Sequence, residues 1–169
     1  MAALVVRHAE PGDARRLAEI HVETWRATYA GVLPQDVLDG LSVDEREGLW
    51  REWIPHPETE VFVVVPDGEL VGFASVGPSW NNPGVGELYS IYVLPRAHGS
   101  GAGPALMHAA VAALARRFDE AILWVATVNP RARRFYERHG WVADGERVDS
   151  IAGASVPETR YRLSGLRQR

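Results

Sequence analysis

The sequence predicts one α/β (α+β) domain in which helices flank a mixed β-sheet of about seven strands. Segments with helical spacing of apolar residues alternate with short β-branched runs, which indicates both kinds of element. Two of these runs are joined by residues 66–69, Pro-Asp-Gly-Glu, a sequence typical of a hairpin, so the sheet cannot be wholly parallel. At 169 residues and with no dividing linker, the chain is expected to form a single domain over residues 1–169.

The N-terminal third is predicted to hold one short strand and three helices. The strand covers residues 4–7, and Asp13 is expected to cap the first helix, which the spacing of Ala18, Val22, Trp25 and Tyr29 predicts. A short second helix is expected at residues 34–41. Ser42, followed three residues later by Glu45, is a capping-box pattern for a third helix, which ends before residue 55.

The remaining two thirds alternate between strands and helices. Strands are predicted at residues 61–65, 70–76, 87–94, 121–128, 141–147 and 156–163. A loop rich in Gly, Pro and Asn covers residues 78–86, one helix follows the strand that ends at Leu94, and another covers residues 130–139.

A glycine-rich turn connects the strand that ends at Leu94 to the next helix. Gly99, Gly101 and Gly103 permit positive φ angles and the close approach of a ligand. The first turn of the helix offers unpaired N–H groups and the positive end of its dipole, so the turn is expected to bind a phosphate or pyrophosphate. The turn lacks the lysine of a Walker loop, and its third glycine comes one residue too early for a dinucleotide fingerprint.

The pattern Arg96-x-x-Gly99-x-Gly101 resembles the acetyl-CoA-binding motif of the GNAT superfamily of N-acetyltransferases. A second segment, residues 129–141, is similar to the family's other signature, with an asparagine at its start, an aromatic-tyrosine pair, and Gly-Trp at its end. The resemblance covers residues 61–163. It implies a strongly twisted sheet whose fourth and fifth strands, residues 87–94 and 121–128, splay apart and hold acetyl-CoA between them.

The resemblance also implies which residues bind acetyl-CoA. Main-chain groups of Ile91 and Val93 would bond the pantetheine arm, and Asn129 would cap a helix and touch that arm. The turn that holds the pyrophosphate would comprise Arg96, His98, Gly99, Ser100, Gly101, Ala102, Gly103 and Ala105. His98 departs from the arginine or glycine common in the family, but a site built from backbone N–H groups does not depend on that side chain.

Two residues are expected, by the same resemblance, to carry the chemistry. Glu87 lies six residues before Val93, where the histone-acetylating branch of the family has a glutamate base, and burial would raise its pKa toward neutrality. A water chain as the base, or a strand-end glutamate that faces water or pairs with an arginine, is the alternative. Tyr136 resembles the general acid that protonates the leaving thiolate, and its alternative is a core tyrosine bonded to a backbone carbonyl.

The acceptor is expected to be a small primary amine, because residues 21–38 resemble members of the family that act on small amines such as polyamines. Trp25 and Tyr29, with Trp50 and Trp53 nearby, fall in the region that in this family forms one wall of the acceptor site, and aromatic rings there would stabilise a cationic amine. A row of aromatic residues on a helix is also typical of a hydrophobic core. Trp80 could cover the acceptor site or simply pack against the protein. The alternatives are a protein N-terminus or lysine as acceptor, or a non-catalytic acyl-CoA-binding or regulatory module.

Composition limits the classes of partner that the protein is expected to bind. A formal charge of −4 disfavours nucleic acid and anionic membranes, and no apolar run approaches the length of a membrane span. The six histidines lack metal-ligand spacing, so no metal is expected. The absence of cysteine excludes disulfides and cysteine nucleophiles and favours a cytoplasmic location. A homodimer is possible, since dimers are common in the family that the motifs resemble.

Overall fold

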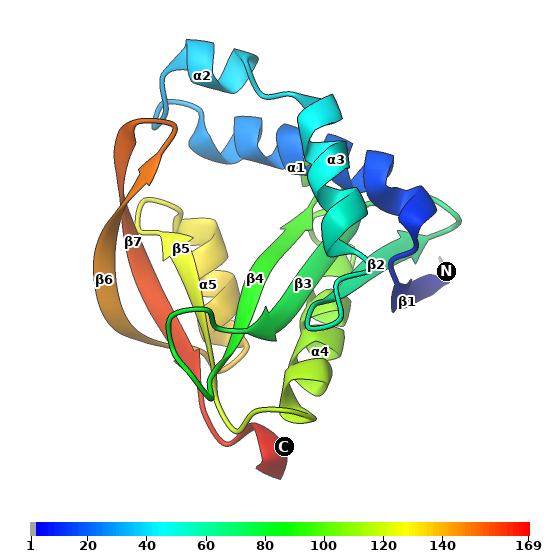
Figure 1. Cartoon of the computed structure of the whole chain (residues 1–169), viewed down its shortest axis with the longest axis vertical. Helices are drawn as coiled ribbons and strands as arrows, with labels where there is room; N and C mark the ends of the chain where they lie inside the picture. Colours follow the sequence, from blue (N-terminus) through cyan, green and yellow to red (C-terminus); the bar gives the residue numbers. More distant parts are fainter. Residues whose placement is uncertain (1–2) are drawn as a thin grey trace.

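The computed structural model describes residues 3–169 and contains one seven-stranded sheet in the order β1-β2-β3-β4-β5-β7-β6 (Figure 1). Its strands are β1 (Leu4–His8), β2 (Glu60–Pro66), β3 (Gly72–Pro78), β4 (Gly86–Val93), β5 (Ala121–Ala126), β6 (Val142–Ile151) and β7 (Ala154–Leu163). All neighbouring strands pair antiparallel except β4 and β5, which are parallel. The predicted mixed sheet is therefore confirmed.

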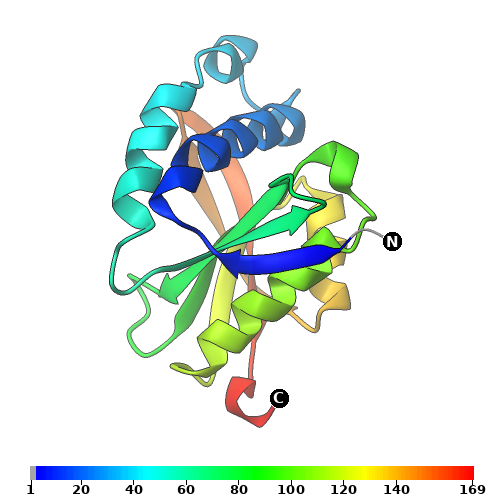
Figure 2. The ribbon, with the colours of Figure 1, turned by 90° about the vertical axis from the view of Figure 1, so that its right-hand side faces the viewer.

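Helices cover both faces of the sheet. They are α1 (Ala14–Tyr29), α2 (Gln35–Asp39), α3 (Val43–Trp53), α4 (Ala102–Ala115) and α5 (Pro130–Arg138). Figure 2 shows α1 and α3 on one face and α4 on the other. Within residues 3–169, no helix has both the length and the apolar composition that crossing a bilayer requires.

The core lies on both sides of β2, β3 and β4. From α4, Leu106, Met107 and Leu114 are buried against one face of these strands, while Leu17 and Ile20 of α1 are buried against the other. Removing this apolar surface from water stabilises the fold by roughly 25 cal/mol per Å². The packing on two faces fixes β4 in place, and β4 carries several of the predicted site residues.

Side-chain capping explains where two of the helices begin. The Ser42 hydroxyl accepts a hydrogen bond from the backbone of Glu45 and begins α3, as predicted. Asp13 holds the N-cap position of α1, as predicted, but its side chain makes no capping hydrogen bond to that helix. Its carboxylate instead accepts the N–H of Glu10 at 2.8 Å and forms an ion pair with Arg7, also at 2.8 Å, because a 3₁₀ turn at Pro11–Asp13 precedes α1.

The parallel strands β4 and β5 separate soon after they meet. They pair only at Gly86 with Ala121 and at Glu87 with Ile122. One residue later β4 contains a β-bulge: Leu88 pairs with Val76 and Ser90 with Ser75 of β3, which leaves Tyr89 as the extra residue. A bulge bends a strand and increases its twist. The bulge therefore turns β4 away from β5, as the resemblance implied without naming the cause.

Candidate functional site at the splayed strands

The glycine turn between β4 and α4 needs its glycines for two different reasons. Gly99 and Gly101 have φ angles of +80° and +91°, and nothing lies within 4 Å of a Cβ built at either. Their backbone conformation, rather than crowding, therefore requires glycine. The expectation of a positive φ at Gly103 is wrong, because Gly103 lies within α4. A Cβ there would stand 3.3 Å from the ring of Phe135, so this glycine permits the close approach of α5.

Three backbone donors of this turn have no acceptor among residues 3–169: the N–H groups of Gly99, Gly101 and Gly103. Ala102 donates to the Ser100 hydroxyl at 3.3 Å, and that hydroxyl donates to the carbonyl of Ala97. The open donors stand at the N-terminal end of α4, where the helix dipole is positive. This arrangement can hold phosphate oxygens through backbone groups alone. Ala102 is buried and Ala105 half-buried, so neither offers a polar side chain.

The charged side chains around the turn are arranged differently from the expectation. Arg96, named as a site residue, is turned toward the β2–β3 turn, where its Nη2 lies 2.5 Å from Glu69. The ring of His98 lies 3.0 Å from the carbonyl oxygen of Val93. Burial and the charge of Arg131 lower the pKa of His98, which places Arg131 of α5 near the turn. Sequence reasoning overlooked Arg131, although a basic residue in the first turn of α5 was a usable signal.

Beyond the bulge, one edge of β4 has no partner strand. Ile91 and Val93 pair with Ala74 and Gly72 of β3 on one side, while the pairing with β5 has already ended at Glu87. Both residues are half-buried. Their strand therefore offers main-chain groups to the gap between β4 and β5, where an extended ligand can be hydrogen-bonded as a strand would be.

Helix α5 presents Tyr136 from the other side of that gap. Asn129 caps this helix by accepting the N–H of Ala132 at 3.2 Å. Tyr136 is 8% exposed, and within the described residues its hydroxyl makes no hydrogen bond, unlike a core tyrosine bonded to a carbonyl. Burial, with the nearby phenol groups of Tyr92 and Tyr29, raises the pKa of Tyr136. Its hydroxyl therefore keeps its proton and can donate it.

Glu87 is half-buried at the point where β4 and β5 part. Its Oε1 accepts a hydrogen bond from the Ser79 hydroxyl at 3.3 Å, and the Asn82 amide donates to the same hydroxyl at 3.1 Å. Burial raises the pKa of Glu87, while the Ser79 hydrogen bond and the charge of Arg147 oppose that shift. No ion pair of Glu87 is found in the part of the chain that the structure describes. The carboxylate is thus placed to take up a proton.

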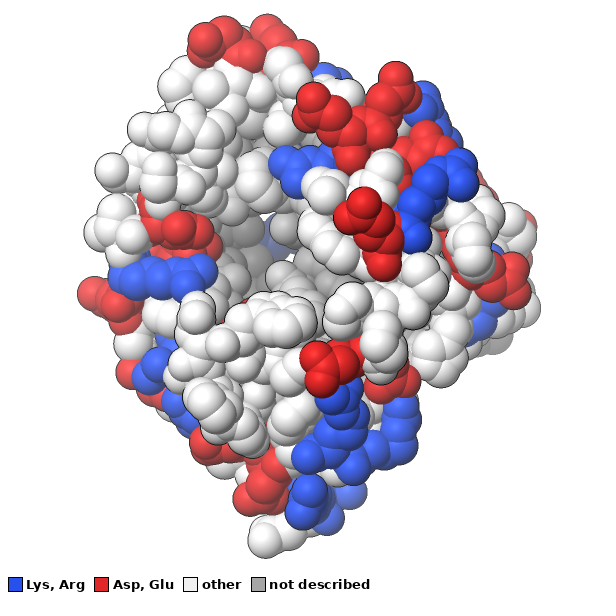
Figure 3. Space-filling view, viewed as in Figure 1, with Lys and Arg blue, Asp and Glu red and all other residues white. Residues whose placement is uncertain are grey.

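Glu158 of β7 connects Glu87 to the tyrosines. Its charge raises the pKa of Glu87 and contributes to the raised pKa values of Tyr29 and Tyr92, both of which are dominated by burial. By the register of β5, Glu87 and Glu158 lie on the same face of the sheet, and Tyr29 and Tyr92 both adjoin Trp25. The phenol groups of Tyr29 and Tyr92 in turn raise the pKa of Tyr136. Figure 3 shows that this face of the molecule is hollowed at its centre.

The aromatic residues expected at the acceptor site have different environments. Trp25 and Tyr29 stand 4.9 Å apart on α1, and the indole of Trp25 donates to the hydroxyl of Tyr92 at 3.1 Å. Trp50 is buried against Phe73 and belongs to the core, and its neighbour Trp53 is partly exposed. Trp80 is 65% exposed in the β3–β4 loop, so it does not pack into the core.

Four residues of this space were missed by sequence reasoning: Ser79, Tyr92, Arg147 and Glu158. Each lies in a strand or loop without a motif, and only the folded sheet brings it to Glu87. Among residues 3–169, no group of three or more histidine, aspartate or glutamate side chains is arranged to hold a metal ion.

Comparisons with known proteins agree on the family. The model of the acetyltransferase (GNAT) family matches residues 14–141. An N-acetyltransferase of Bacillus subtilis named YuaI is 35% identical over 159 residues, covering 92% of this chain and 90% of its own. The yncA protein of Salmonella typhimurium, solved with its cofactor acetyl-CoA, is 20% identical with a TM-score of 0.74 and coverages of 96% and 94%. A spermidine N-acetyltransferase SpeG variant from Vibrio cholerae is 23% identical with a TM-score of 0.71 and the same coverages.

The two signature segments thus flank the place where β4 and β5 separate, and the family model spans both segments. The chain belongs to the GNAT family of acetyltransferases.

Proposed function

We propose that this protein transfers the acetyl group of acetyl-CoA directly to a small primary amine within a ternary complex. The observation that carries the proposal is the open edge of β4, which begins at the half-buried Glu87 carboxylate, together with the buried Tyr136, whose hydroxyl makes no hydrogen bond among residues 3–169. Known relatives include enzymes named for spermidine acetylation, which favours a small amine over a protein as acceptor.

The chain's own groups fit acetyl-CoA as the acyl donor. The open N–H groups of Gly99, Gly101 and Gly103 suit the pyrophosphate, with Arg131 close enough to add positive charge. The free edge of β4 at Ile91 and Val93 suits the amide groups of the pantetheine arm. When bound, acetyl-CoA would supply a thioester whose carbonyl carbon is open to attack by an amine.

Proton transfer is the part of the reaction that the side chains perform. The amine nitrogen forms a bond to the thioester carbon, and the carbon–sulfur bond breaks. Glu87 takes the proton from the incoming ammonium, directly or through water, because its raised pKa makes it a base suited to a neutral solution. Tyr136 donates its proton to the departing sulfur, where negative charge develops. The nitrogen loses two protons in all: Glu87 takes the first and releases it to solvent, and the second, lost once the carbon–nitrogen bond has formed, replaces the proton that Tyr136 gave to the sulfur. The products are the N-acetylated amine, the CoA thiol and one released proton, and no covalent enzyme intermediate is needed.

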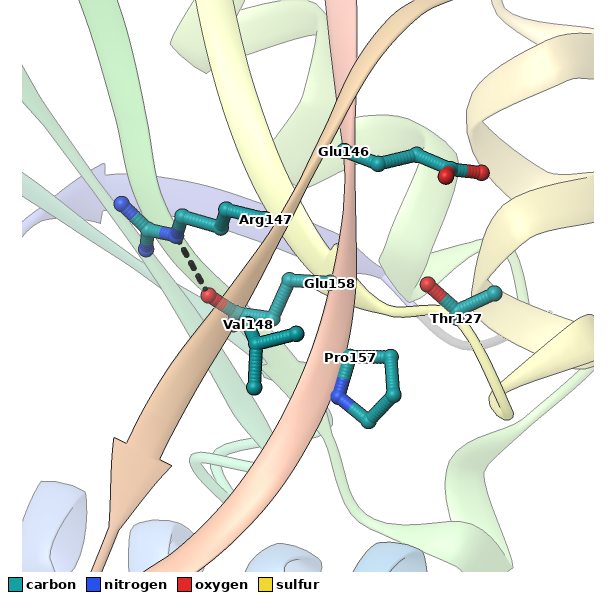
Figure 4. A pocket seen from close by; sticks show the side chains of 6 residues that line it. All are labelled: Thr127, Glu146, Arg147, Val148, Pro157 and Glu158. Carbon is teal, nitrogen blue, oxygen red and sulfur yellow. Dashed lines mark hydrogen bonds and ion pairs between the residues drawn. The ribbon is translucent and has the colours of Figure 1, made fainter.

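The test is turnover of a panel of primary amines, scored by release of the CoA thiol. The chain contains no cysteine, so it adds no thiol background. Glu87→Gln is expected to lower kcat by roughly 10²–10⁴-fold, as for the loss of general base catalysis, with little change in acetyl-CoA affinity. Glu146→Gln is the matched control, because Figure 4 shows that side chain on the opposite side of the β6–β7 hairpin from Arg147.

Two outcomes would contradict the proposal. If acetyl-CoA does not raise the melting temperature, the donor site is wrong. If acetyl-CoA raises it but no amine is acetylated, the protein is an acyl-CoA-binding module rather than an enzyme.

A further inference from the structure

Arg147 is held in a defined position on β6. On β6, adjacent side chains alternate between the two faces of the sheet. Figure 4 shows that Glu146 points toward α5, whereas Arg147 points to the other side and bonds Glu158. The Nε of Arg147 donates to Glu158 at 2.8 Å, and its guanidinium carbon lies 4.0 Å from the ring centre of Trp124. A cavity of about 320 Å³ adjoins this part of the hairpin and is lined by Thr127, Glu146, Arg147, Val148, Pro157 and Glu158.

The opposite end of this guanidinium has free hydrogen-bond donors. Within residues 3–169, neither terminal nitrogen of Arg147 makes a hydrogen bond, and the ion pair of Nη2 with Asp149, at 3.9 Å, is too long for one. Glu158, whose side chain is 10% exposed, therefore fixes the inner edge of the guanidinium. The outer edge keeps two parallel N–H donors available to a ligand.

The register of the sheet places Arg147 and Glu87 on the same face. Glu87 pairs with Ile122 of β5, and Ala126, four residues further along β5, pairs with Glu158, which pairs in turn with Arg147. The charge of Arg147 also lowers the pKa of Glu87. Arg160 and Arg162 of the same hairpin are engaged elsewhere, because they share the carboxylate of Asp144 through their Nε atoms, at 2.7 Å each. A group bound to Arg147 would thus stand next to an amine that is being deprotonated by Glu87.

We propose that Arg147 binds a carboxylate of the acceptor, so that the acceptor is an amino acid or a similar amine with a carboxylate close to its amino group. Two parallel N–H donors match the two oxygens of a carboxylate, and a guanidinium already oriented by Glu158 and Trp124 loses little entropy on binding. Glu158 is a positioning residue in this arrangement. The inference rests on the proposed function and names the class of its acceptor.

A polyamine fits this place less well. Glu158 balances the charge of Arg147, so the difference lies in hydrogen bonding. The open edge of the guanidinium offers N–H donors only, and an ammonium group has no acceptor to pair with them, whereas a carboxylate has two oxygens. Aromatic neighbours such as Trp25 and Tyr29 remain available for the acceptor's apolar side chain.

The experiment compares matched acceptors and matched arginine variants. Phenylalanine, phenylalaninamide and phenethylamine share one apolar group and differ in the carboxylate, as do leucine, leucinamide and isoamylamine, with spermidine added as a polyamine. We expect each free acid to exceed its amide in kcat/KM by about tenfold or more, since a hydrogen bond to a charged group contributes about 1.5–3 kcal/mol.

Arg147→Gln is expected to raise KM for the free acids by roughly 10–100-fold while KM for the amides stays within about twofold, since only the acids lose a charged partner. Arg147→Lys, which keeps the charge but loses the parallel donors, is expected to fall between. Arg160→Gln is the matched control, because Arg160 also lies over Trp124, at 5.7 Å, and pairs with an acid of the same hairpin. It should keep the wild-type ratio of acid to amide, and melting curves would verify that each variant is folded.

Three results would overturn the inference. Equal rates for acids and amides, or a preference for spermidine, would contradict an acceptor that carries a carboxylate. The proposed acetyltransferase activity would be unaffected. Equal losses for acids and amides in Arg147→Gln would reduce Arg147 to a support for Glu158. No turnover of any amine, with acetyl-CoA still raising the melting temperature, would overturn the proposed function and this inference together.

Discussion

The Ser79 hydroxyl lies 3.3 Å from a carboxylate oxygen of Glu87, and it holds this position because the Asn82 amide donates to it from behind. The contact joins the β3–β4 loop to the first residues of β4. A donor to a carboxylate stabilises the ionised form, so Ser79 opposes the effect of burial on Glu87. The β3–β4 loop therefore helps to set the pH above which Glu87, the proposed base, is ionised.

Ser79→Ala is expected to move the acidic limb of the pH–rate profile to higher pH. Burial, the larger effect, already raises the pKa of Glu87, and the substitution removes a hydrogen bond that lowers it. A base with a higher pKa is protonated at a higher pH, so activity is lost earlier as the solution is acidified. The measurement is kcat/KM against pH for wild type and variant. An acidic limb that stays in place would show that another group, or water, is the base.

Tyr136→Phe is expected to lower kcat by ~10-fold or more, if one hydrogen bond of about 1.4 kcal/mol to the departing sulfur is lost. Acetyl-CoA binding should survive, because the ring and its packing are kept. Tyr161→Phe is the control: its hydroxyl donates to Glu137 at 2.8 Å and accepts from Arg133 at 3.0 Å, so it is a structural group. That variant should melt earlier and turn over normally. The reverse pattern would refute the assignment of Tyr136 as the acid.

Gly101→Val is expected to abolish the rise in melting temperature that acetyl-CoA causes. A valine at a φ of +91° is strained by ~1–2 kcal/mol, and relief of that strain would turn the open N–H groups of the turn away. Gly68→Val imposes the same strain in the β2–β3 turn, since Gly68 has a φ of +81° and equally open surroundings. We expect the two variants to lose similar stability, while acetyl-CoA raises the melting temperature of Gly68→Val only. If acetyl-CoA raises the melting temperature of both variants, the turn around Gly101 is not the acetyl-CoA site.

Stability should fall on acidification because of His21. Burial among aromatic rings, together with the charge of Arg46, lowers the pKa of His21 to about 4 from an ordinary 6.5. The unfolded chain therefore binds this proton first. The free energy of unfolding should decrease as pH falls from about 6.5 to about 4, by about 3 kcal/mol in total, and not further from this group.

Denaturant unfolding at several pH values measures that slope. His21→Leu should flatten it between pH 6.5 and 4, since the titrating ring is replaced by an apolar side chain. His108→Leu, at an exposed position of α4, should keep the wild-type slope. An unchanged slope in His21→Leu would assign the acid sensitivity to other groups.

Much of the fold could be predicted from local sequence. The hairpin at residues 66–69 and the Ser42 cap depend on neighbouring residues only, and both are present. Asp13 holds the predicted N-cap position, but its carboxylate does not cap α1 because it pairs with Arg7 of β1. The bulge at Tyr89 was not foreseen, since it is set by register against β3 and has no marker in the sequence.

The site divides in the same way. The glycine turn and Asn129 were found because each acts within a few residues of itself, through φ angles or a helix cap. Arg147 and Glu158 could not be found, because strand pairing across β6 and β7 brings them together and the register across β5 places them on the same face as Glu87. No motif or residue spacing in the sequence predicts that these residues lie on one face.

The bulge at Tyr89 gives the protein an unusual kind of strand edge. Edges of sheets normally lie on the outside, where they can recruit the strands of other molecules and lead to aggregation. Here the free edge of β4 lies inside the sheet, between two strands that still touch at Gly86 and Glu87. Because β4 and β5 remain joined at that end, the strand of another molecule cannot pair along the whole length of β4. One inserted residue thereby converts a hazard of β-structure into a place for an extended ligand.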